Sequence, residues 1–285
     1  VGTAMTVLQS GKHSRLGLRV TLAIAALVMT GCAEHHKRTA TRSSVDTLRV
    51  LSYNIHHAEG MDGEVDLERI ADLINRLEPD VVALQEVDQV VERTDHVDQA
   101  TVLGEMTGLT PEFGAFMDYQ GGQYGMALLS RWKVVDATNV RLPDGAEPRS
   151  SVVATLESPT TGNRVVIAGI HFYRTEEERM AQAKTLVTEL KDRSKPVILV
   201  GDFNSQPGST VMQYLEREWS VMNKGENRFT FPSYAPAREI DFIVARRDAE
   251  LELLSHEVLN EPVMSDHQPI FAEILIHATL VDERP

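Results

Sequence analysis

The sequence contains a single cysteine, Cys32, so the chain cannot form an intramolecular disulfide. Basic charge is also scarce, because 28 lysines and arginines stand against 42 aspartates and glutamates, and the net charge is −14. No basic run is interleaved with aromatic residues. Long-range attraction to a phosphate backbone is therefore not expected. This argues against a dedicated nucleic-acid binder, but a local cationic groove in an acidic protein leaves a nuclease possible.

A confident membrane-spanning segment is missing too. Residues 16–29 form an apolar run that is interrupted by Arg19 and Thr21 and follows a short basic stretch. The run is too short for a confident membrane span and is typical of a secretory signal. Residues 28–32 resemble a bacterial lipoprotein processing site, where cleavage before the cysteine is coupled to acylation of its thiol. A plain secretory signal with an incidental cysteine is the alternative.

The lipoprotein interpretation divides the chain into three parts. Residues 1–31 are expected to be the signal peptide, and residues 32–46 a polar tether that is anchored to the membrane through lipidated Cys32. Residues 47–285 remain for one domain of roughly 240 residues, since no internal repeat or second linker follows. Ala33 after the cysteine resembles sorting to the outer membrane of Gram-negative bacteria. We therefore expect a lipid-anchored protein of the cell envelope, on the periplasmic side of the outer membrane.

The domain alternates between strand and helix patterns, which indicates an α/β fold. Several strand-rich stretches in its middle favour two sheets packed face to face with helices outside. Helices are predicted at 67–77, 97–106 and 175–191 and near 209–217, and strands at 48–55, 81–84, 125–129, 151–156, 164–170, 197–200, 240–244 and 270–276.

Polar side chains follow two of the predicted strands near the start of the domain. Glu86 comes shortly after the apolar residues 81–84, at a strand end where open α/β sheets usually bind ligands. Its carboxylate is a natural ligand for Mg²⁺ or Mn²⁺. Asn54 ends the preceding strand and offers an amide oxygen to the metal or its water. The alternatives are an exposed strand-end charge and a turn-forming asparagine, and the adjacent His56 and His57 are either supporting groups or structural histidines.

A second polar segment follows the strand at 196–200. Asp202 and Asn204 are two residues apart, so both point to the same side if the backbone stays extended. Gly201 lets the backbone approach a ligand closely. An aspartate that activates water and an asparagine that holds a phosphoryl oxygen would suit this arrangement. A turn built from these three residues is the structural alternative.

Further candidates stand near other strands. His267 can donate a hydrogen bond to a charged phosphoryl group if a carboxylate holds its other nitrogen, and Asp241, between apolar neighbours, is the best partner. Asp266 precedes this histidine. His171 ends the strand at 164–170 and supplies a second imidazole. Arg149 is a candidate for bidentate contact with phosphate.

In their order along the chain, these residues resemble the motifs of the endonuclease/exonuclease/phosphatase superfamily, across almost all of the chain after residue 47. The resemblance implies a four-layer α/β sandwich of two mixed sheets and divalent-metal hydrolysis of a phosphoester. In that family, the glutamate matching Glu86 binds the metal, assisted by the residues matching Asn54 and often Asp266. The aspartate matching Asp202 positions or activates the attacking water, and the residue matching Asn204 contacts phosphate.

The resemblance also assigns the remaining residues. The histidine matching His267 is oriented by the aspartate matching Asp241, and the position of His171 holds histidine or tyrosine in different branches. The predicted mechanism is in-line attack of water on phosphorus, with one Mg²⁺ on Glu86 and no covalent enzyme intermediate.

The substrate is predicted from weaker signals. Residues 54–63, 92–99 and 229–232 look like a bacterial branch that is also similar to a hydrolase-like domain linked to glycosylphosphatidylinositol remodelling. A lipid or sugar phosphodiester is therefore favoured, and a monomer is expected. A secreted nuclease is the main alternative and would need a basic groove, for which the sequence offers only Arg149 and a group at Arg131, Lys133 and Arg141. A binding lipoprotein without catalysis is the third possibility, which the intact motif set disfavours.

Overall fold

A computed structural model describes residues 45–193 and 196–277 of the chain. The predicted signal peptide, Cys32 and most of the predicted tether lie outside the described residues. The first strand begins at Val45, two residues before the predicted start of the domain. Within the described ranges, no helix has the length and apolar character needed to cross a membrane.

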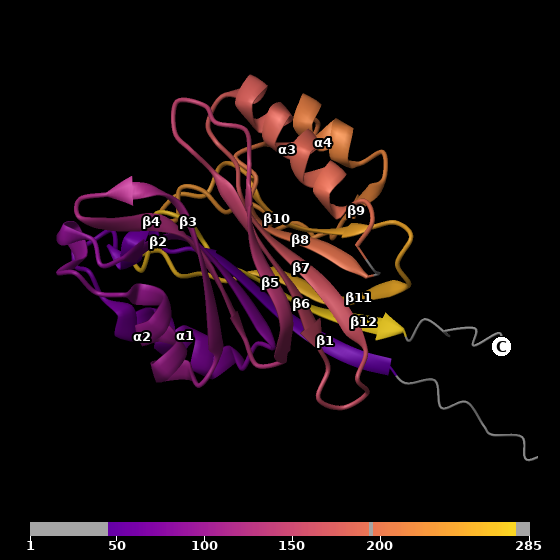
Figure 1. Ribbon diagram of the computed structural model, residues 1–285, viewed down its shortest axis with the longest axis horizontal. Coiled ribbons are helices and arrows are strands. Elements are labelled where there is room, and N and C mark those ends of the chain that lie inside the picture. The colour runs from indigo at the N-terminus through magenta and orange to yellow at the C-terminus, as the bar shows by residue number, and fades with distance from the viewer. Residues whose placement is uncertain (1–44, 194–195, 278–285) are drawn as a thin grey trace, which may run out of the picture. The chain divides into compact units, whose positions relative to one another are not determined.

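Twelve strands form two six-stranded sheets, ordered β11-β12-β1-β2-β4-β3 and β5-β6-β7-β8-β10-β9 (Figure 1). Both sheets are mixed, because β1 pairs with β2 and β7 with β8 in parallel, whereas the other neighbours are antiparallel. The first sheet contains β1 (Val45–Asn54), β2 (Val81–Gln89), β3 (Thr110–Tyr119), β4 (Gly122–Ser130), β11 (Leu251–Val258) and β12 (Ile270–His277). The second contains β5 (Lys133–Arg141), β6 (Ser150–Glu157), β7 (Arg164–His171), β8 (Val197–Asp202), β9 (Trp219–Val221) and β10 (Asp241–Arg246).

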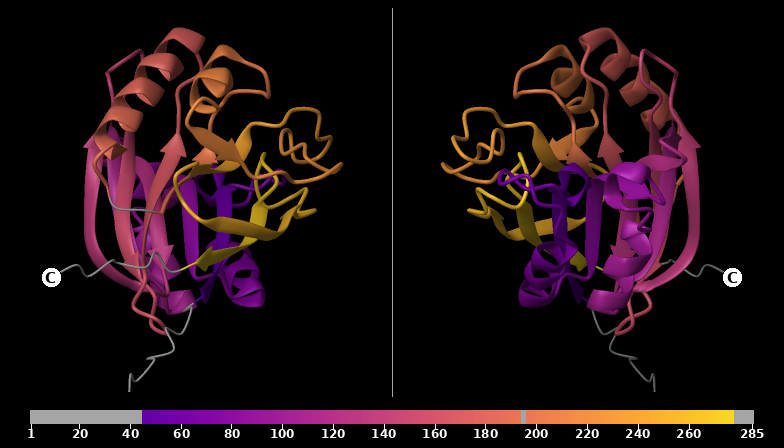
Figure 2. Two further views of the ribbon diagram at one scale, coloured as in Figure 1. Left: turned by 90° about the vertical axis from the view of Figure 1, so that its right-hand side faces the viewer. Right: turned by 90° about the vertical axis from the view of Figure 1, so that its left-hand side faces the viewer.

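Two helices cover the outer face of each sheet. The first sheet carries α1 (Leu67–Leu77) and α2 (Gln99–Thr107), and the second carries α3 (Glu176–Leu190) and α4 (Thr210–Leu215). Each helix starts behind a side chain that accepts a hydrogen bond from the first turn, as helix N-termini require. Figure 2 shows the helix pairs on opposite sides of the stacked sheets. The predicted four-layer α/β sandwich is therefore confirmed.

The central strands are buried on both faces. In β8, Ile198 and Val200 join the core between the sheets, whereas Val197 and Leu199 pack under α3 and α4. A strand covered on both sides reads as a continuous apolar run instead of an alternating one. This explains why the sequence revealed these strands clearly.

The four strands that the sequence analysis missed are β3, β5, β9 and β11. All four stand at the edges of their sheets. Most residues of β5 and β11 are exposed or half-buried, so neither segment shows an apolar run. Edge strands commonly carry polar residues that prevent further pairing, and this conceals them in a sequence.

Candidate active site

The fold brings the ends of four central strands together at one edge of the sandwich. In the parallel pairs, Asn54 of β1 stands beside Gln85 of β2, and His171 of β7 beside Asp202 of β8. The antiparallel strand β10 begins here too, with Asp241 opposite Asp202. Carboxyl ends of parallel strands are the usual ligand-binding edge of such sheets.

Glu86 reaches this edge through a β-bulge. The prediction placed it at a strand end, but β2 continues to Gln89, and the pairing with β4 shifts between Gln85 and Val87. Glu86 is the extra residue and has a left-handed backbone, with φ 59°. The bulge turns the side chain out of the regular alternation and into the site, which is a common use of bulges near active sites.

Asn54 lies between two carboxylates. Its Nδ2 donates to Oε1 of Glu86 at 3.1 Å and to Oδ2 of Asp202 at 3.4 Å. Its Oδ1 accepts the backbone N–H of His56 at 3.1 Å. The predicted contact of the amide oxygen with a metal or its water stays a prediction. Asn54 here orients the two carboxylates on neighbouring sheets.

Asp202 is buried, and both of its carboxylate oxygens have partners. Its Oδ1 accepts the backbone N–H of Asn204 at 2.7 Å, and its Oδ2 lies 3.7 Å from Nε2 of both His171 and His267. Burial, followed by the charge of Asp241, raises the pKa of Asp202 to about 7. A carboxylate whose pKa is near neutrality is suited to accept a proton from water.

The segment after β8 corrects two expectations. Asn204 has φ 49°, so the backbone is not extended, and its Nδ2 donates to the Phe172 carbonyl at 2.9 Å and to Asp202 at 3.3 Å. Gly201 has φ 145°, and a Cβ there would meet the carbonyl oxygen of Ile170 at 2.0 Å. The glycine therefore allows close contact with the adjacent strand.

His267 and Asp241 form the expected pair. Nδ1 of His267 lies 3.0 Å from Oδ2 of Asp241, and both side chains are buried. Burial lowers the pKa of His267, but the charge and hydrogen bond of Asp241, with the charges of Asp202 and Asp266, outweigh it and raise the pKa to about 10. The imidazole is thus a cation with Nε2 facing Asp202.

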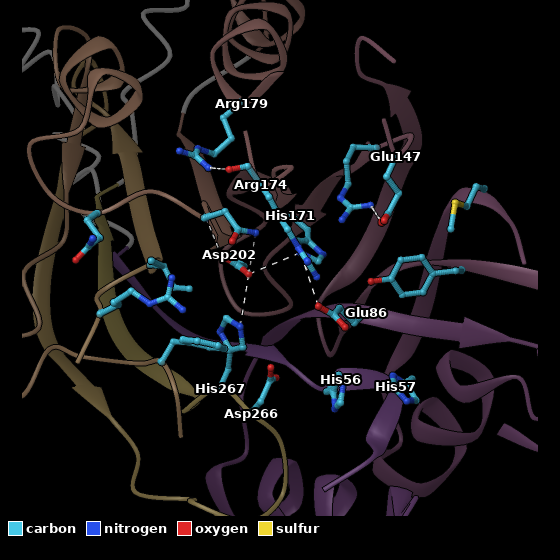
Figure 3. A pocket seen from close by; sticks show the side chains of 18 of the residues that line it. His56, His57, Glu86, Glu147, His171, Arg174, Arg179, Asp202, Asp266 and His267 are labelled. Carbon is cyan, nitrogen blue, oxygen red and sulfur yellow. Dashed lines mark hydrogen bonds and ion pairs between the residues drawn. The ribbon is translucent and has the colours of Figure 1, made fainter. Parts of the chain in front are cut away.

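The pKa of His171 is shifted in the opposite direction from that of His267. Burial lowers its pKa well below the ordinary value, and the nearby cations Arg149 and His267 lower it further. Its Nε2 lies 3.9 Å from Oε1 of Glu86, and its Nδ1 is buried with no partner among the described residues. One charged imidazole, that of His267, and one neutral imidazole, that of His171, therefore face Asp202 (Figure 3).

Arg149 is buried, with only 4% of its surface exposed. Its guanidinium forms an ion pair with Glu147 and lies over the rings of Phe116 and Tyr173, at 4.9 and 5.5 Å from their centroids. Aromatic stacking and an ion pair hold the planar group in one orientation, as bidentate recognition of an anion requires.

These side chains share one cavity of about 860 Å³. Of the predicted residues, Asn54 and Asp241 stand behind its wall as hydrogen-bond partners. The predicted residues that line the cavity itself are Glu86, Arg149, His171, Asp202, Asn204, Asp266 and His267.

Five arginines line the same cavity. The sequence analysis identified only one of them, Arg149, and the others are Arg93, Arg174, Arg179 and Arg238. Arg131, Lys133 and Arg141, the basic group proposed from the sequence, are absent from the lining. The cationic side chains come from separate loops and helices, so no local pattern could have revealed them.

The donor set fits a divalent metal ion. Glu86 and Asp266 both present carboxylate oxygens to the cavity, and Mg²⁺ and Mn²⁺ prefer such ligands. Asp202, Asp241 and His267 also have ligand atoms within 4.8 Å of one another, but the protonated imidazole of His267 cannot bind a metal, so this group is not part of the donor set. A hydrogen bond joins the segments that contain Asp266 and Asn54, since the side-chain Oγ of Ser265 donates to the backbone carbonyl of Asn54 at 2.7 Å.

Comparisons with solved structures agree with this fold. A functionally unknown protein from Enterococcus faecalis superposes with a TM-score of 0.68 at 20% identity, covering 80% of this chain and 99% of that one. The human Nocturnin catalytic domain, solved with bound sulfate, gives 0.65 at 22% identity and covers 83% and 98%. A mannosyl-6-phosphatase from Bacteroides thetaiotaomicron gives 0.64 at 18% identity and covers 80% and 99%.

These three likenesses establish the fold. No curated protein matches the sequence significantly. The model of the Endonuclease/Exonuclease/phosphatase family matches residues 51–267, which include every predicted site residue of the domain. The chain therefore belongs to the endonuclease/exonuclease/phosphatase family.

Proposed function

We propose that this protein is a Mg²⁺-dependent or Mn²⁺-dependent phosphodiesterase that acts on a lipid head group or a sugar phosphate. Members of its family hydrolyse phosphoester bonds. The observation that carries the proposal is the position of Asp202 beside one cationic and one neutral imidazole, in a cavity lined by arginines.

Each residue has a role in the proposed reaction. Asp202 holds the attacking water and accepts its proton, as its raised pKa allows. His267 stabilises negative charge on the phosphoryl oxygens, and Asp241 keeps it protonated and oriented. Arg149 binds a phosphate oxygen pair from its stacked position. A divalent ion on Glu86 and Asp266 would supply further positive charge to the phosphoryl group.

The substrate class follows from the cavity. A volume of about 860 Å³ suits a small molecule or a head group, and five arginines favour a ligand with more than one anionic group. A protein of this fold is named a mannosyl-6-phosphatase, which is a phosphomonoesterase, so it supports recognition of a sugar phosphate group but not cleavage of a diester.

A nuclease is the second candidate. It requires local positive charge in an acidic protein. Five arginines supply cationic groups to the cavity, although five carboxylates line it as well.

One set of assays tests both candidates. The purified protein is incubated with bis(p-nitrophenyl) phosphate, phospholipids, mannose phosphates and plasmid DNA, with and without EDTA. We expect EDTA-sensitive hydrolysis of the first compound and of a lipid or sugar substrate, with loss of at least about a hundredfold in His267→Ala. Rapid DNA cleavage without action on lipids or sugars would favour the nuclease, and EDTA-resistant hydrolysis would contradict metal dependence.

We also propose that Cys32 is acylated and anchors the protein on the periplasmic side of the outer membrane. The resemblance of residues 28–32 to a lipoprotein processing site supports this. Labelled palmitate should enter the wild-type protein and be absent from Cys32→Ser. Equal labelling of both would exclude this anchor.

A further inference from the structure

Two adjacent histidines of the cavity, His56 and His57, have no role in the proposed reaction. They follow β1 in a short 3-10 turn, η1 (His56–Ala58). The three residues of this turn have φ of 47°, 46° and 66°, which places three successive non-glycine residues in the left-handed region. This conformation is uncommon for such residues. The ring centroids of the two histidines are 4.5 Å apart, and Figure 3 shows both below Glu86.

Each ring has one nitrogen anchored by Glu59. Nδ1 of His56 lies 3.2 Å from the backbone carbonyl of Glu59, which can only accept, so this nitrogen carries the proton and Nε2 keeps its lone pair. Nε2 of His57 lies 3.1 Å from the Glu59 carboxylate. The carboxylate accepts from this nitrogen when ionised, which leaves the lone pair on Nδ1.

The second ring nitrogen of His57, Nδ1, has no contact of the kind that Glu59 makes with Nε2 in the part of the chain that the structure describes. His57 is 6% exposed, and its Nδ1 is buried with no hydrogen-bond partner among the described residues. A buried polar atom without a partner is costly and calls for an explanation. An imidazole that donates one N–H to a carbonyl or carboxylate, with its other nitrogen free, is the usual arrangement of a metal-binding histidine.

Glu86 completes the group. One ligand atom from each of His56, His57 and Glu86 lies within 4.8 Å of the other two. Two imidazoles with one carboxylate suit first-row transition metals, whereas Mg²⁺ prefers oxygen ligands alone.

We propose that His56, His57 and Glu86 form an additional metal site for a first-row transition ion such as Mn²⁺, Co²⁺ or Zn²⁺. The site shares Glu86 with the oxygen ligands described above and has Glu59 as the group that orients both rings. It stands on its own geometry and does not depend on the proposed reaction.

The test measures coordination in the metal-stripped, purified protein. Bound Mn²⁺ is studied by pulsed electron paramagnetic resonance, which detects couplings to nitrogen of a coordinated imidazole, and Co²⁺ affinity is measured by titration. The variants are His56→Asn and His57→Asn, because asparagine tolerates the left-handed backbone. The matched control is His96→Asn, since His96 also has positive φ, 57°, but is exposed and outside the cavity.

We expect nitrogen couplings in the wild-type protein, which decrease in both cavity variants together with at least about a tenfold loss of Co²⁺ affinity. His96→Asn should match the wild type. Nitrogen couplings from any other histidine would be present in the wild type and in every variant, so they do not affect the difference between them.

Two results would overturn the proposal. Absence of nitrogen couplings from the wild-type protein excludes the site without reliance on any variant. Couplings and affinity that are unchanged in both folded cavity variants, as judged by circular dichroism, exclude these histidines as ligands. Because neither readout is turnover, either result leaves the proposed phosphodiesterase activity untouched.

Discussion

The charge on His267 depends on Asp241, and replacing this aspartate provides a direct test of the site. The pKa of His267 lies at about 10 although burial alone would lower it. The difference from the ordinary value of 6.5 corresponds to about 5 kcal/mol in favour of the imidazolium. Asp241 is the first contributor to this preference, through its charge and through the 3.0 Å contact with Nδ1.

Asp241→Asn keeps the shape and removes the charge. In this variant burial still lowers the pKa of His267, and only the charges of Asp202 and Asp266 still raise it. We therefore expect this pKa to fall by at least about 2 pH units. In the pH profile of kcat/KM for bis(p-nitrophenyl) phosphate, the alkaline limb should move to lower pH by a similar number of units. Because the proposed cation is lost above this pH, the rate should fall by about twofold or more at pH 8 and by at least about tenfold at pH 9.

Two measurements check this expectation. Nuclear magnetic resonance follows the His267 ring of the metal-free protein through the titration, and a pH series of kcat/KM follows the reaction. Asp72→Asn, an exposed substitution on α1, is the matched control and should change neither. If the pKa of His267 stays near 10 in Asp241→Asn, the carboxylate does not hold the charge and the reasoning is refuted.

Two further predictions concern stability. Gly201→Ala should lower the free energy of unfolding by at least about 2 kcal/mol in urea titrations, because its Cβ would meet the Ile170 carbonyl oxygen at 2.0 Å. Gly162→Ala, with φ 78° and nothing within 4 Å, should cost only about 1 kcal/mol, and equal costs would contradict the steric argument. Burial lowers the pKa of His256 to about 3, because Nε2 is buried without a partner although part of the ring is exposed. The unfolded chain thus binds more protons below pH 6.5, so stability is lost as pH falls, by about 1–2 kcal/mol between pH 7 and 5. His256→Gln should lack this loss, and parallel pH profiles of the two proteins would exclude it.

The residues of the candidate site could be predicted because each motif is local to a central strand. Strands β2, β7 and β8 are buried on both faces, so their apolar runs are clear and the polar residues that follow them stand out. The pairing of His267 with Asp241 was also predictable, since a carboxylate between apolar neighbours needs a partner. The edge strands lack such runs, which is why four of them were missed.

Backbone conformation was less accessible to the sequence analysis. The bulge at Glu86 and the left-handed backbone of Asn204 reverse side-chain directions that simple strand alternation predicts. The orientation of the Asn54 amide depends on two acceptors that lie 32 and 148 residues away in the chain.

The sequence by itself determined the family, the central strands and the acidic and imidazole groups that end them, because each of these signals lies within a short segment. The tertiary structure alone decided the character of the cavity. Five arginines converge there from positions between Arg93 and Arg238, in a chain with net charge −14. Local field depends on distances in space and not on total composition, so only the folded chain shows that these arginines share one cavity with the carboxylates of the site.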